Sequence, residues 1–168
     1  MPKDNQSICM NEPIRNMTVC GYEFNYIQNI EPKKNENGAI IEYQPQVNYS
    51  NSQGRDLHKY GKGSFCKFTI TAENLSGVYL WVVDDEIIYI GRTKRFRTRF
   101  NSGYGTISGR NCYKDGQVTN CKMNKVALEL SRAGKRIQLY FFKTDDYVRV
   151  EQELLATQKT KYNSMNNK

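Results

Sequence analysis

Two tyrosines, each close to a glycine, stand on neighbouring strand-like runs of the sequence. Tyr79 lies in the run GVYLWVV that begins at Gly77, and Tyr89 lies in the run EIIYI that ends just before Gly91. Because a short turn joins the runs, we expect two buried antiparallel strands. A glycine where the second strand ends lets a backbone or a substrate approach closely, so the phenolic hydroxyls could meet the arginines that follow. The alternative is that both tyrosines are ordinary core residues.

A short basic helix is expected directly after the second strand. Residues 93–101 place Phe96 and Phe100 on one side of a helix and arginines on its other faces. Residues 102–121 hold four glycines and few apolar residues, so they are expected to form a loop. The helix therefore predicts a basic surface beside the end of the sheet.

Three further elements are expected in the C-terminal part of the chain. They are a helix at residues 123–133, a strand at 137–142 and a helix from 145 to about 161, which Thr144 can cap. The last helix is expected to turn Val148, Leu154 and Leu155 toward the core. This order predicts a mixed α/β (α+β) domain over residues 75–168, a small sandwich in which helices flank a short central three-stranded antiparallel sheet. Both tyrosine-bearing strands are expected to be central in that sheet.

Residues 1–74 are expected to form an N-terminal arm and a β-rich extension beside that domain. Residues 1–20 have neither helical nor strand periodicity, which predicts an irregular arm. The runs at 22–30 and 40–43 lie on either side of Asn37-Gly38 and predict a hairpin. The remaining expectations are a loop at residues 48–62 and a strand at residues 64–70.

Positive charge is concentrated in one stretch of the chain. The formal net charge is +8, and residues 92–143 contain 13 basic residues but only two acidic ones, Asp115 and Glu129. Aromatic residues are interleaved with this charge, a combination that favours nucleic acid as the partner. A solubilising surface is the alternative. The candidate nucleic-acid contacts are Lys94, Arg95, Arg97, Arg110 and Lys122.

The cysteines and the hydropathy point to a cytoplasmic protein without a zinc site. The five cysteines include no CxxC pair, and the single histidine, His58, is not near a cysteine pair. Free thiols are therefore expected. No apolar run reaches the length that a membrane-spanning helix needs, and the first residues lack the apolar core of a secretory signal.

The two tyrosine runs resemble the signature of the GIY-YIG nuclease superfamily. Gly77-Val78-Tyr79 and Tyr89-Ile90-Gly91 look like its two tripeptides. An arginine of that family follows the second tyrosine by ten positions, where this chain has Arg99. A metal-binding glutamate of the family precedes an asparagine by twelve residues, as Glu151 precedes Asn163 here. The resemblance covers about residues 75–163.

The resemblance implies hydrolysis of phosphodiester bonds in DNA. It implies that Tyr79 is the general base, that Arg99 holds the scissile phosphate, and that Glu151 is the single protein ligand of a Mg²⁺ ion, for which Mn²⁺ could substitute. Mg²⁺ commonly keeps most of its waters, so one carboxylate suffices. Arginines and a cation would lower the pKa of a phenol that is about 10 when unperturbed.

The other expected site residues have supporting roles. Arg92 is expected to contact the phosphate or the attacking water, and Tyr89 either joins the catalytic set or supports it structurally. Asn163 is expected to orient the site or the terminal segment. The family often has Tyr or His four residues after the helix arginine, where this chain has Gly103, so the auxiliary role of Tyr104 stays open. Thr160 stands where the family usually has proline.

The long loop at 102–121 is similar to that of the restriction-endonuclease branch of the superfamily. A type II restriction-like enzyme is the first hypothesis, acting on double-stranded DNA, with a homodimer on DNA and a cognate DNA methyltransferase as expected partners. The alternatives are a phage, mobile-element or DNA-repair nuclease of the same superfamily, or a catalytically silent nucleic-acid-binding protein.

Overall fold

Strands from three distant stretches of the sequence form one sheet in the protein, which we describe from a computed structural model covering residues 16–50 and 52–163. The chain divides into two compact units. Among the described residues, unit 1 comprises 16–29, 76–94 and 138–163, and unit 2 comprises 30–50, 52–75 and 95–137.

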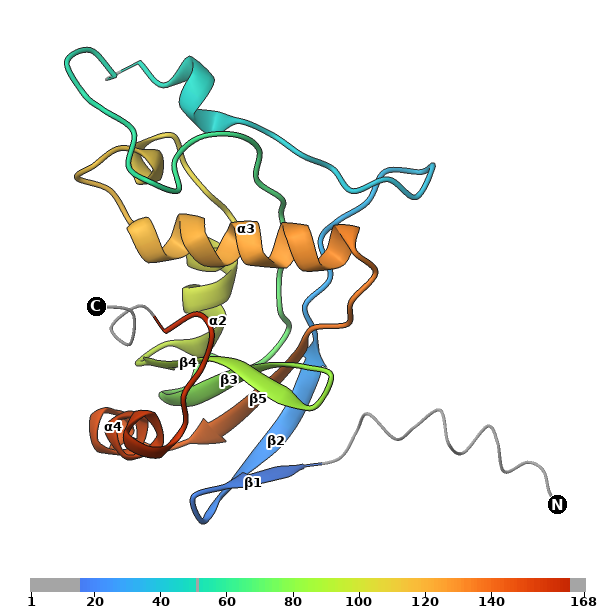
Figure 1. The fold of residues 1–168 in the computed structure, drawn as a ribbon, viewed down its shortest axis with the longest axis vertical. Coiled ribbons are helices and arrows are strands. Elements are labelled where there is room, and N and C mark those ends of the chain that lie inside the picture. Colours follow the sequence, from blue (N-terminus) through green and yellow to red (C-terminus); the bar gives the residue numbers. More distant parts are fainter. Residues whose placement is uncertain (1–15, 51, 164–168) are drawn as a thin grey trace, which may run out of the picture. The chain divides into compact units, whose positions relative to one another are not determined.

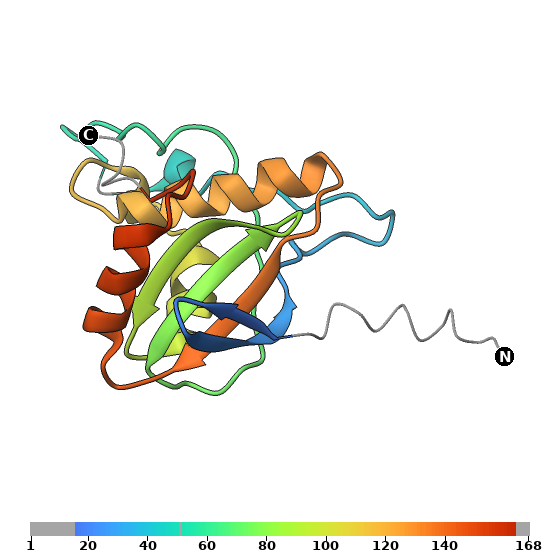
Figure 2. The ribbon, with the colours of Figure 1, turned by 60° about the horizontal axis from the view of Figure 1, so that its bottom comes forward.

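Unit 1 is built on a five-stranded antiparallel sheet (Figures 1 and 2). Its strands are β1 (Met17–Val19), β2 (Tyr22–Asn29), β3 (Gly77–Val83), β4 (Glu86–Thr93) and β5 (Gln138–Lys143), in the spatial order β1-β2-β5-β3-β4. The mixed α/β class and the strands at β3, β4 and β5 are therefore confirmed. The three-stranded sheet is wrong, because β2 pairs with β5 and brings β1 with it. The expectation that both tyrosine-bearing strands are central is also wrong, because β4 is an edge strand.

The turn between β3 and β4, together with a bulge near it, sets the register of these strands. Asp84 and Asp85 have φ angles of 53° and 65°. Two positive φ angles are the mark of a type I′ turn, whose twist matches that of the two strands. Aspartate tolerates this conformation better than most residues. Next to the turn, Val83 pairs with Glu86 and Val82 with Ile87, and a bulge then shifts the register by one residue. Beyond the bulge, Tyr79 stands opposite Gly91 and Val78 opposite Arg92.

Helix α4 (Tyr147–Thr157) covers one face of the sheet in unit 1, beside the β3 and β4 strands (Figure 2). Its Val150 and Leu154 are buried in one cluster with Val78 and Leu80 of β3. The expectation that Val148 faces the core is wrong, because Val148 is exposed. Val148 stands two residues before Val150, and an α-helix turns about 100° per residue. The two side chains therefore point to nearly opposite sides of the helix. The helix also ends at Thr157, four residues before the expected end.

Unit 2 contains helix α3 (Val118–Arg132), the short helix α2 (Phe96–Arg99) and a π-helical turn, η3 (Phe100–Tyr104). Two 3₁₀ turns complete it, η2 (Pro45–Asn48) and η4 (Arg110–Cys112). The predicted helices are present, and α3 begins five residues earlier than expected. Phe96 and Phe100 are fully buried, as the amphipathic pattern predicts.

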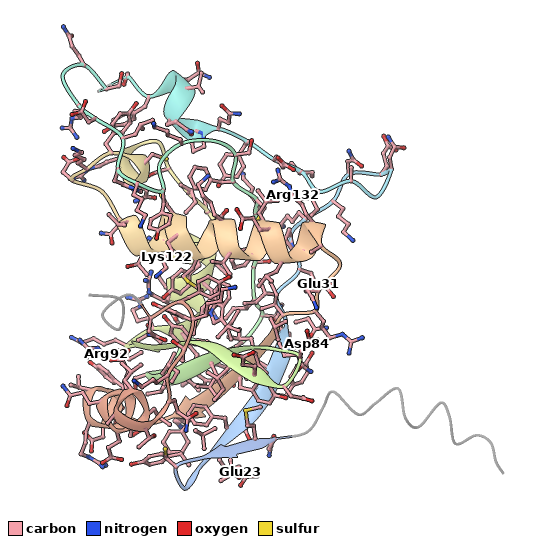
Figure 3. The ribbon with its side chains drawn as sticks, in the orientation of Figure 1. Glu23, Glu31, Asp84, Arg92, Lys122 and Arg132 are labelled. Carbon is pink, nitrogen blue, oxygen red and sulfur yellow. The ribbon has the colours of Figure 1, made fainter. Side chains whose placement is uncertain are left out.

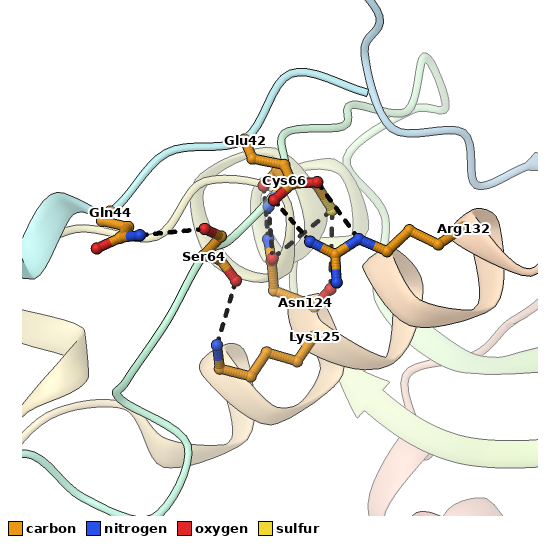
Figure 4. Close-up of polar contacts among 7 residues, drawn as sticks. All are labelled: Glu42, Gln44, Ser64, Cys66, Asn124, Lys125 and Arg132. Carbon is orange, nitrogen blue, oxygen red and sulfur yellow. Dashed lines mark hydrogen bonds and ion pairs between the residues drawn. The ribbon is translucent and has the colours of Figure 1, made fainter. Parts of the chain in front are cut away.

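The segment 64–70 in unit 2 is extended but is not a strand of a sheet, so that expectation is wrong. The side-chain amide of Asn124 accepts a hydrogen bond from the backbone N–H of Cys66 and donates one to its carbonyl (Figure 4). Asn101 makes the same pair of bonds with Ile70. Two amide side chains therefore satisfy backbone groups that a neighbouring strand would satisfy in a sheet.

The prediction that residues 22–30 and 40–43 form a hairpin is wrong, because the two runs do not pair with each other. The turn predicted between them is present. Gly38 has a φ of 84°, and the chain closes there with the single bridge Lys34–Ile40. The run that begins at Tyr22 instead pairs with β1 and β5. β1 also contradicts the irregular arm at residues 17–19, while residues 1–15 lie outside the described part of the chain.

Candidate active site

The ring of Tyr79 lies over Gly91, its partner across the β3–β4 pair. A methyl group built on Gly91 would overlap the Cζ and Oη atoms of Tyr79, so only glycine leaves room for the phenol. Tyr79 itself is 1% exposed. Gly91, which stands two residues after Tyr89 in the sequence, therefore makes the space that the ring of Tyr79 occupies.

Tyr89 belongs to the same row of aromatic side chains. Its ring centroid lies 6.5 Å from that of Tyr79 and 6.2 Å from that of Trp81, which it meets edge to face. Residues two apart on a strand, and residues opposite each other on paired strands, share a face of the sheet. Tyr79, Trp81 and Tyr89 therefore form one aromatic face.

The carboxyl group of Glu151 lies beside Arg92. The Arg92 Nη1 atom donates to Oε1 of Glu151 at 3.2 Å, and the Glu151 side chain is 15% exposed against 45% for Arg92. Burial raises the pKa of the Glu151 carboxyl above its ordinary value, and the charge of Arg92 offsets part of that rise. Arg92 extends from the end of β4 (Figure 3). A carboxylate held half-buried in this way is a candidate cation ligand.

The tyrosines and Glu151 approach β4 from different faces of the sheet. Arg92 is opposite Val78, and Val78 packs in the cluster that includes Val150 of α4. Glu151 therefore belongs to the α4 face, whereas Tyr79 belongs to the aromatic face. The two groups meet β4 at consecutive residues, Gly91 and Arg92, on the strand that forms the sheet edge. The fold thus brings them to one edge but not to one face.

Asn163 closes that same edge of the sheet. Its side chain accepts a hydrogen bond from the N–H of Ile90 at 2.9 Å and donates one to the Ile90 carbonyl at 2.8 Å. Ile90 lies between Tyr89 and Gly91, and the N–H of Tyr162 bonds the carbonyl of Ile88. Asn163 therefore anchors the C-terminal segment to the edge of β4, next to the tyrosine and glycine of the second tripeptide.

Arg99 and Tyr104 lie together in unit 2. The Cζ atom of Arg99 stands 4.0 Å from the centroid of the Tyr104 ring, a cation–π contact. Arg99 also donates from Nη1 to Oδ1 of Asn120 at 2.6 Å. The contact of Asn120 with Arg99 was not predicted from the sequence, because the position of Asn120 in the loop expected before α3 gave no sign of it.

The expected nucleic-acid contacts differ in exposure. Those on the exposed surface are Lys94, Arg95, Arg97 and Arg110. Lys122 is 8% exposed, and burial lowers the pKa of its amino group. This burial is a poor match for a phosphate contact on an open surface. The basic residues near α2 are therefore the stronger candidates.

Glu151 is the side chain at this edge of the sheet that could hold a cation. Across residues 16–50 and 52–163, no three His, Cys, Asp or Glu side chains gather as a metal cage. Mg²⁺ takes oxygen ligands, retains waters and often uses one or two carboxylates, so a single glutamate fits it better than it fits zinc.

Across residues 16–50 and 52–163, no helix combines the length and apolar character needed to cross a bilayer.

Comparisons of the chain with protein-family models, with curated proteins and with solved structures gave no match. The GIY-YIG resemblance therefore rests on the sequence positions given above.

Proposed function

We propose that the protein is a Mg²⁺-dependent DNA endonuclease of the GIY-YIG type. The observation that carries this proposal is that two groups reach consecutive residues at the edge of β4 from opposite faces of the sheet: the phenol of Tyr79 lies over Gly91, and the carboxyl of Glu151 is held half-buried beside Arg92. Metal-dependent hydrolysis of a phosphodiester uses a proton acceptor and a ligand for the cation.

Tyr79 is the proposed proton acceptor. A phenol can take a proton from water only if its pKa falls toward neutrality, which requires positive charge nearby. Arg92 follows Gly91 directly on β4 and is the candidate to supply that charge, while the resemblance assigns Arg99 to the scissile phosphate. A methyl group at residue 91 would overlap the end of the phenol, so the glycine leaves room for it.

Glu151 is the proposed ligand of one Mg²⁺ ion. Its Oε1 is engaged by Arg92, and the raised pKa of the carboxyl indicates a poorly solvated group that a cation would stabilise in its ionised form. When bound, the ion would polarise the phosphate and stabilise the departing oxygen. Glu151 must therefore be ionised for metal binding, and binding is expected to weaken as the pH falls.

A type II restriction-like enzyme is the preferred form of this activity. It would act on double-stranded DNA as a homodimer, because one site ordinarily cuts one strand, and a DNA methyltransferase would protect the host. The basic residues of α2 support a DNA substrate. A phage, mobile-element or repair nuclease would use the same residues.

A second candidate is a DNA-binding protein without catalysis. The observation that favours it is the alternation of β3 and β4, which assigns Tyr79 and Glu151 to opposite faces of the sheet. In that case Glu151 neutralises Arg92 and has no metal role.

A plasmid-nicking assay distinguishes the two candidates. The purified chain is incubated with supercoiled DNA, with and without Mg²⁺, alongside Glu151→Ala, Tyr79→Phe and the matched control Glu153→Ala. Glu153 lies on the same helix and bonds Arg149 and Tyr22 on the surface. The nuclease proposal predicts that the wild type and Glu153→Ala nick the plasmid only when Mg²⁺ is present. It predicts that Glu151→Ala and Tyr79→Phe do not nick it. DNA binding without nicking in any form of the chain would support the second candidate.

A further inference from the structure

The guanidinium group of Arg99 is held by more contacts than a surface arginine normally makes. Tyr104 stacks on it at 4.0 Å, and Oδ1 of Asn120 accepts a hydrogen bond from its Nη1 at 2.6 Å. Tyr104 is 1% exposed and Asn120 is 6% exposed, so both partners are fixed by their surroundings. An arginine side chain has large rotamer freedom, which these contacts remove.

The π-helical turn explains why Tyr104 can reach Arg99. In an α-helix, residues four apart share a face. The turn η3 bonds the N–H of Gly105 to the carbonyl of Phe100, a spacing of five residues. The extra residue in the turn brings Tyr104, five residues after Arg99, over its guanidinium.

Gly103 occupies the position that an α-helix would place over Arg99. A methyl group built there would lie 2.7 Å from Nη1 of Arg99 and 3.5 Å from Oδ1 of Asn120. The first distance is shorter than a real contact allows, so a side chain at residue 103 would displace the guanidinium. Glycine at 103 and tyrosine at 104 together leave room for the Arg99–Asn120 hydrogen bond.

We infer that Asn120 is a positioning residue, which fixes the orientation of the Arg99 guanidinium for a phosphate with the help of Tyr104 and Gly103. This inference rests on the proposed function, because that function gives Arg99 its phosphate. Asn120 acts through Arg99 and does not itself touch the phosphate. A neutral amide is suited to this role, because it accepts a hydrogen bond without cancelling the positive charge that the phosphate needs.

A double-mutant cycle tests the inference. Cleavage of plasmid DNA is measured for the wild type, Asn120→Ala, Arg99→Ala and the double variant, with Thr119→Ala as the control from the exposed side of the same turn. We expect Asn120→Ala to lower kcat between about 10- and 100-fold with little change in KM, because a small misplacement of a catalytic group has that effect. In the Arg99→Ala background, Asn120→Ala should cause no further decrease in kcat. Equal losses in both backgrounds would overturn the inference.

The variant Gly103→Ala tests the same inference and keeps Asn120, which accepts the hydrogen bond from Arg99. Gly103→Ala should preserve the thermal midpoint, because the backbone φ of Gly103 is not in the left-handed region and alanine favours helix. It should nevertheless lower kcat by a similar factor, since the new methyl group displaces Arg99. Full activity of a folded Gly103→Ala variant would contradict the inference.

An NMR measurement separates failure of this inference from failure of the proposed function. The side-chain ¹⁵N signals of Arg99 should report slow rotation of the guanidinium in the wild type and fast rotation in Asn120→Ala. This readout does not depend on cleavage. If the wild type cuts no DNA but the signals change as expected, the proposed nuclease is wrong while Asn120 still positions Arg99. Fast rotation in the wild type would overturn the inference.

Discussion

The phenol ring of Tyr79 lies directly over Gly91, which faces it across the β3–β4 pair and has no side chain to fill that space. The GVY and YIG tripeptides are thus linked by packing as well as by order in the sequence. The tyrosine of the first tripeptide needs the glycine of the second. This relationship can be tested independently of any activity.

Gly91→Ala should destabilise the fold by about 1–3 kcal/mol, because the added methyl group overlaps the Tyr79 ring in a well-packed sheet. Chemical denaturation measures the change. Tyr79→Leu combined with Gly91→Ala should recover part of the loss, since the shorter side chain makes room for the methyl group. Full stability of the Gly91→Ala single variant would show that the ring moves aside at little cost.

Glu151→Gln should raise the thermal midpoint at neutral pH by roughly 1–3 °C in the absence of Mg²⁺. Burial raises the pKa of Glu151 in the fold above its unfolded value. A carboxyl with a raised pKa contributes stability at low pH and loses it as the pH rises through the folded pKa. The neutral amide of Glu151→Gln avoids that loss. The difference in thermal midpoint between this variant and the wild type should therefore disappear near pH 4.

Glu153→Gln is the matched control for this effect and should change stability in the opposite direction. The hydrogen bonds from Tyr22 and then Arg149 lower the pKa of Glu153. Its ionised form is therefore favoured in the fold at neutral pH. Melting curves at pH 4 and pH 8 for both variants would reveal whether the two glutamates differ as their surroundings indicate.

Asn163→Ala should lower the free energy of unfolding by about 1–3 kcal/mol, because it removes both hydrogen bonds to the backbone of Ile90. The N–H of Ile90 would then lose its partner at the edge of β4. Hydrogen exchange at Ile90 should accelerate more than exchange at Leu80 in β3, which pairs on both sides. Uniform acceleration across the sheet would indicate global destabilisation only.

Arg97→Ala should weaken DNA binding without selecting among sequences. Arg97 is exposed on α2, and the residues around it carry the densest positive charge of the chain. Loss of one phosphate contact should reduce the slope of log K against log salt by about 1. Fluorescence anisotropy with two unrelated duplexes between 50 and about 200 mM salt checks this. An unchanged slope would remove Arg97 from the interface.

The local patterns of the sequence determined several elements of this protein without help from the structure. Continuous apolar runs on either side of Asp84-Asp85 identified β3, its turn and β4, because burial and turn chemistry are written in neighbouring residues. The spacing of Phe96 and Phe100 identified the buried side of the basic helix for the same reason. The resemblance of the tripeptides, Arg99 and Glu151 to the GIY-YIG pattern could be stated from the sequence and stays a prediction, because spacing is a property of the sequence.

Only the tertiary structure decided which strands pair and where the polar side chains lie. The alternation of Tyr22–Asn29 is compatible with any strand partner, and its pairing with β5, more than a hundred residues away, made the sheet five-stranded. Among the described strands β4 pairs only with β3, which leaves it at the edge. A single extra residue in the turn after α2 moved Tyr104 onto Arg99, which α-helical spacing cannot predict. Strand periodicity is local, whereas the choice of partner and face depends on packing between distant residues.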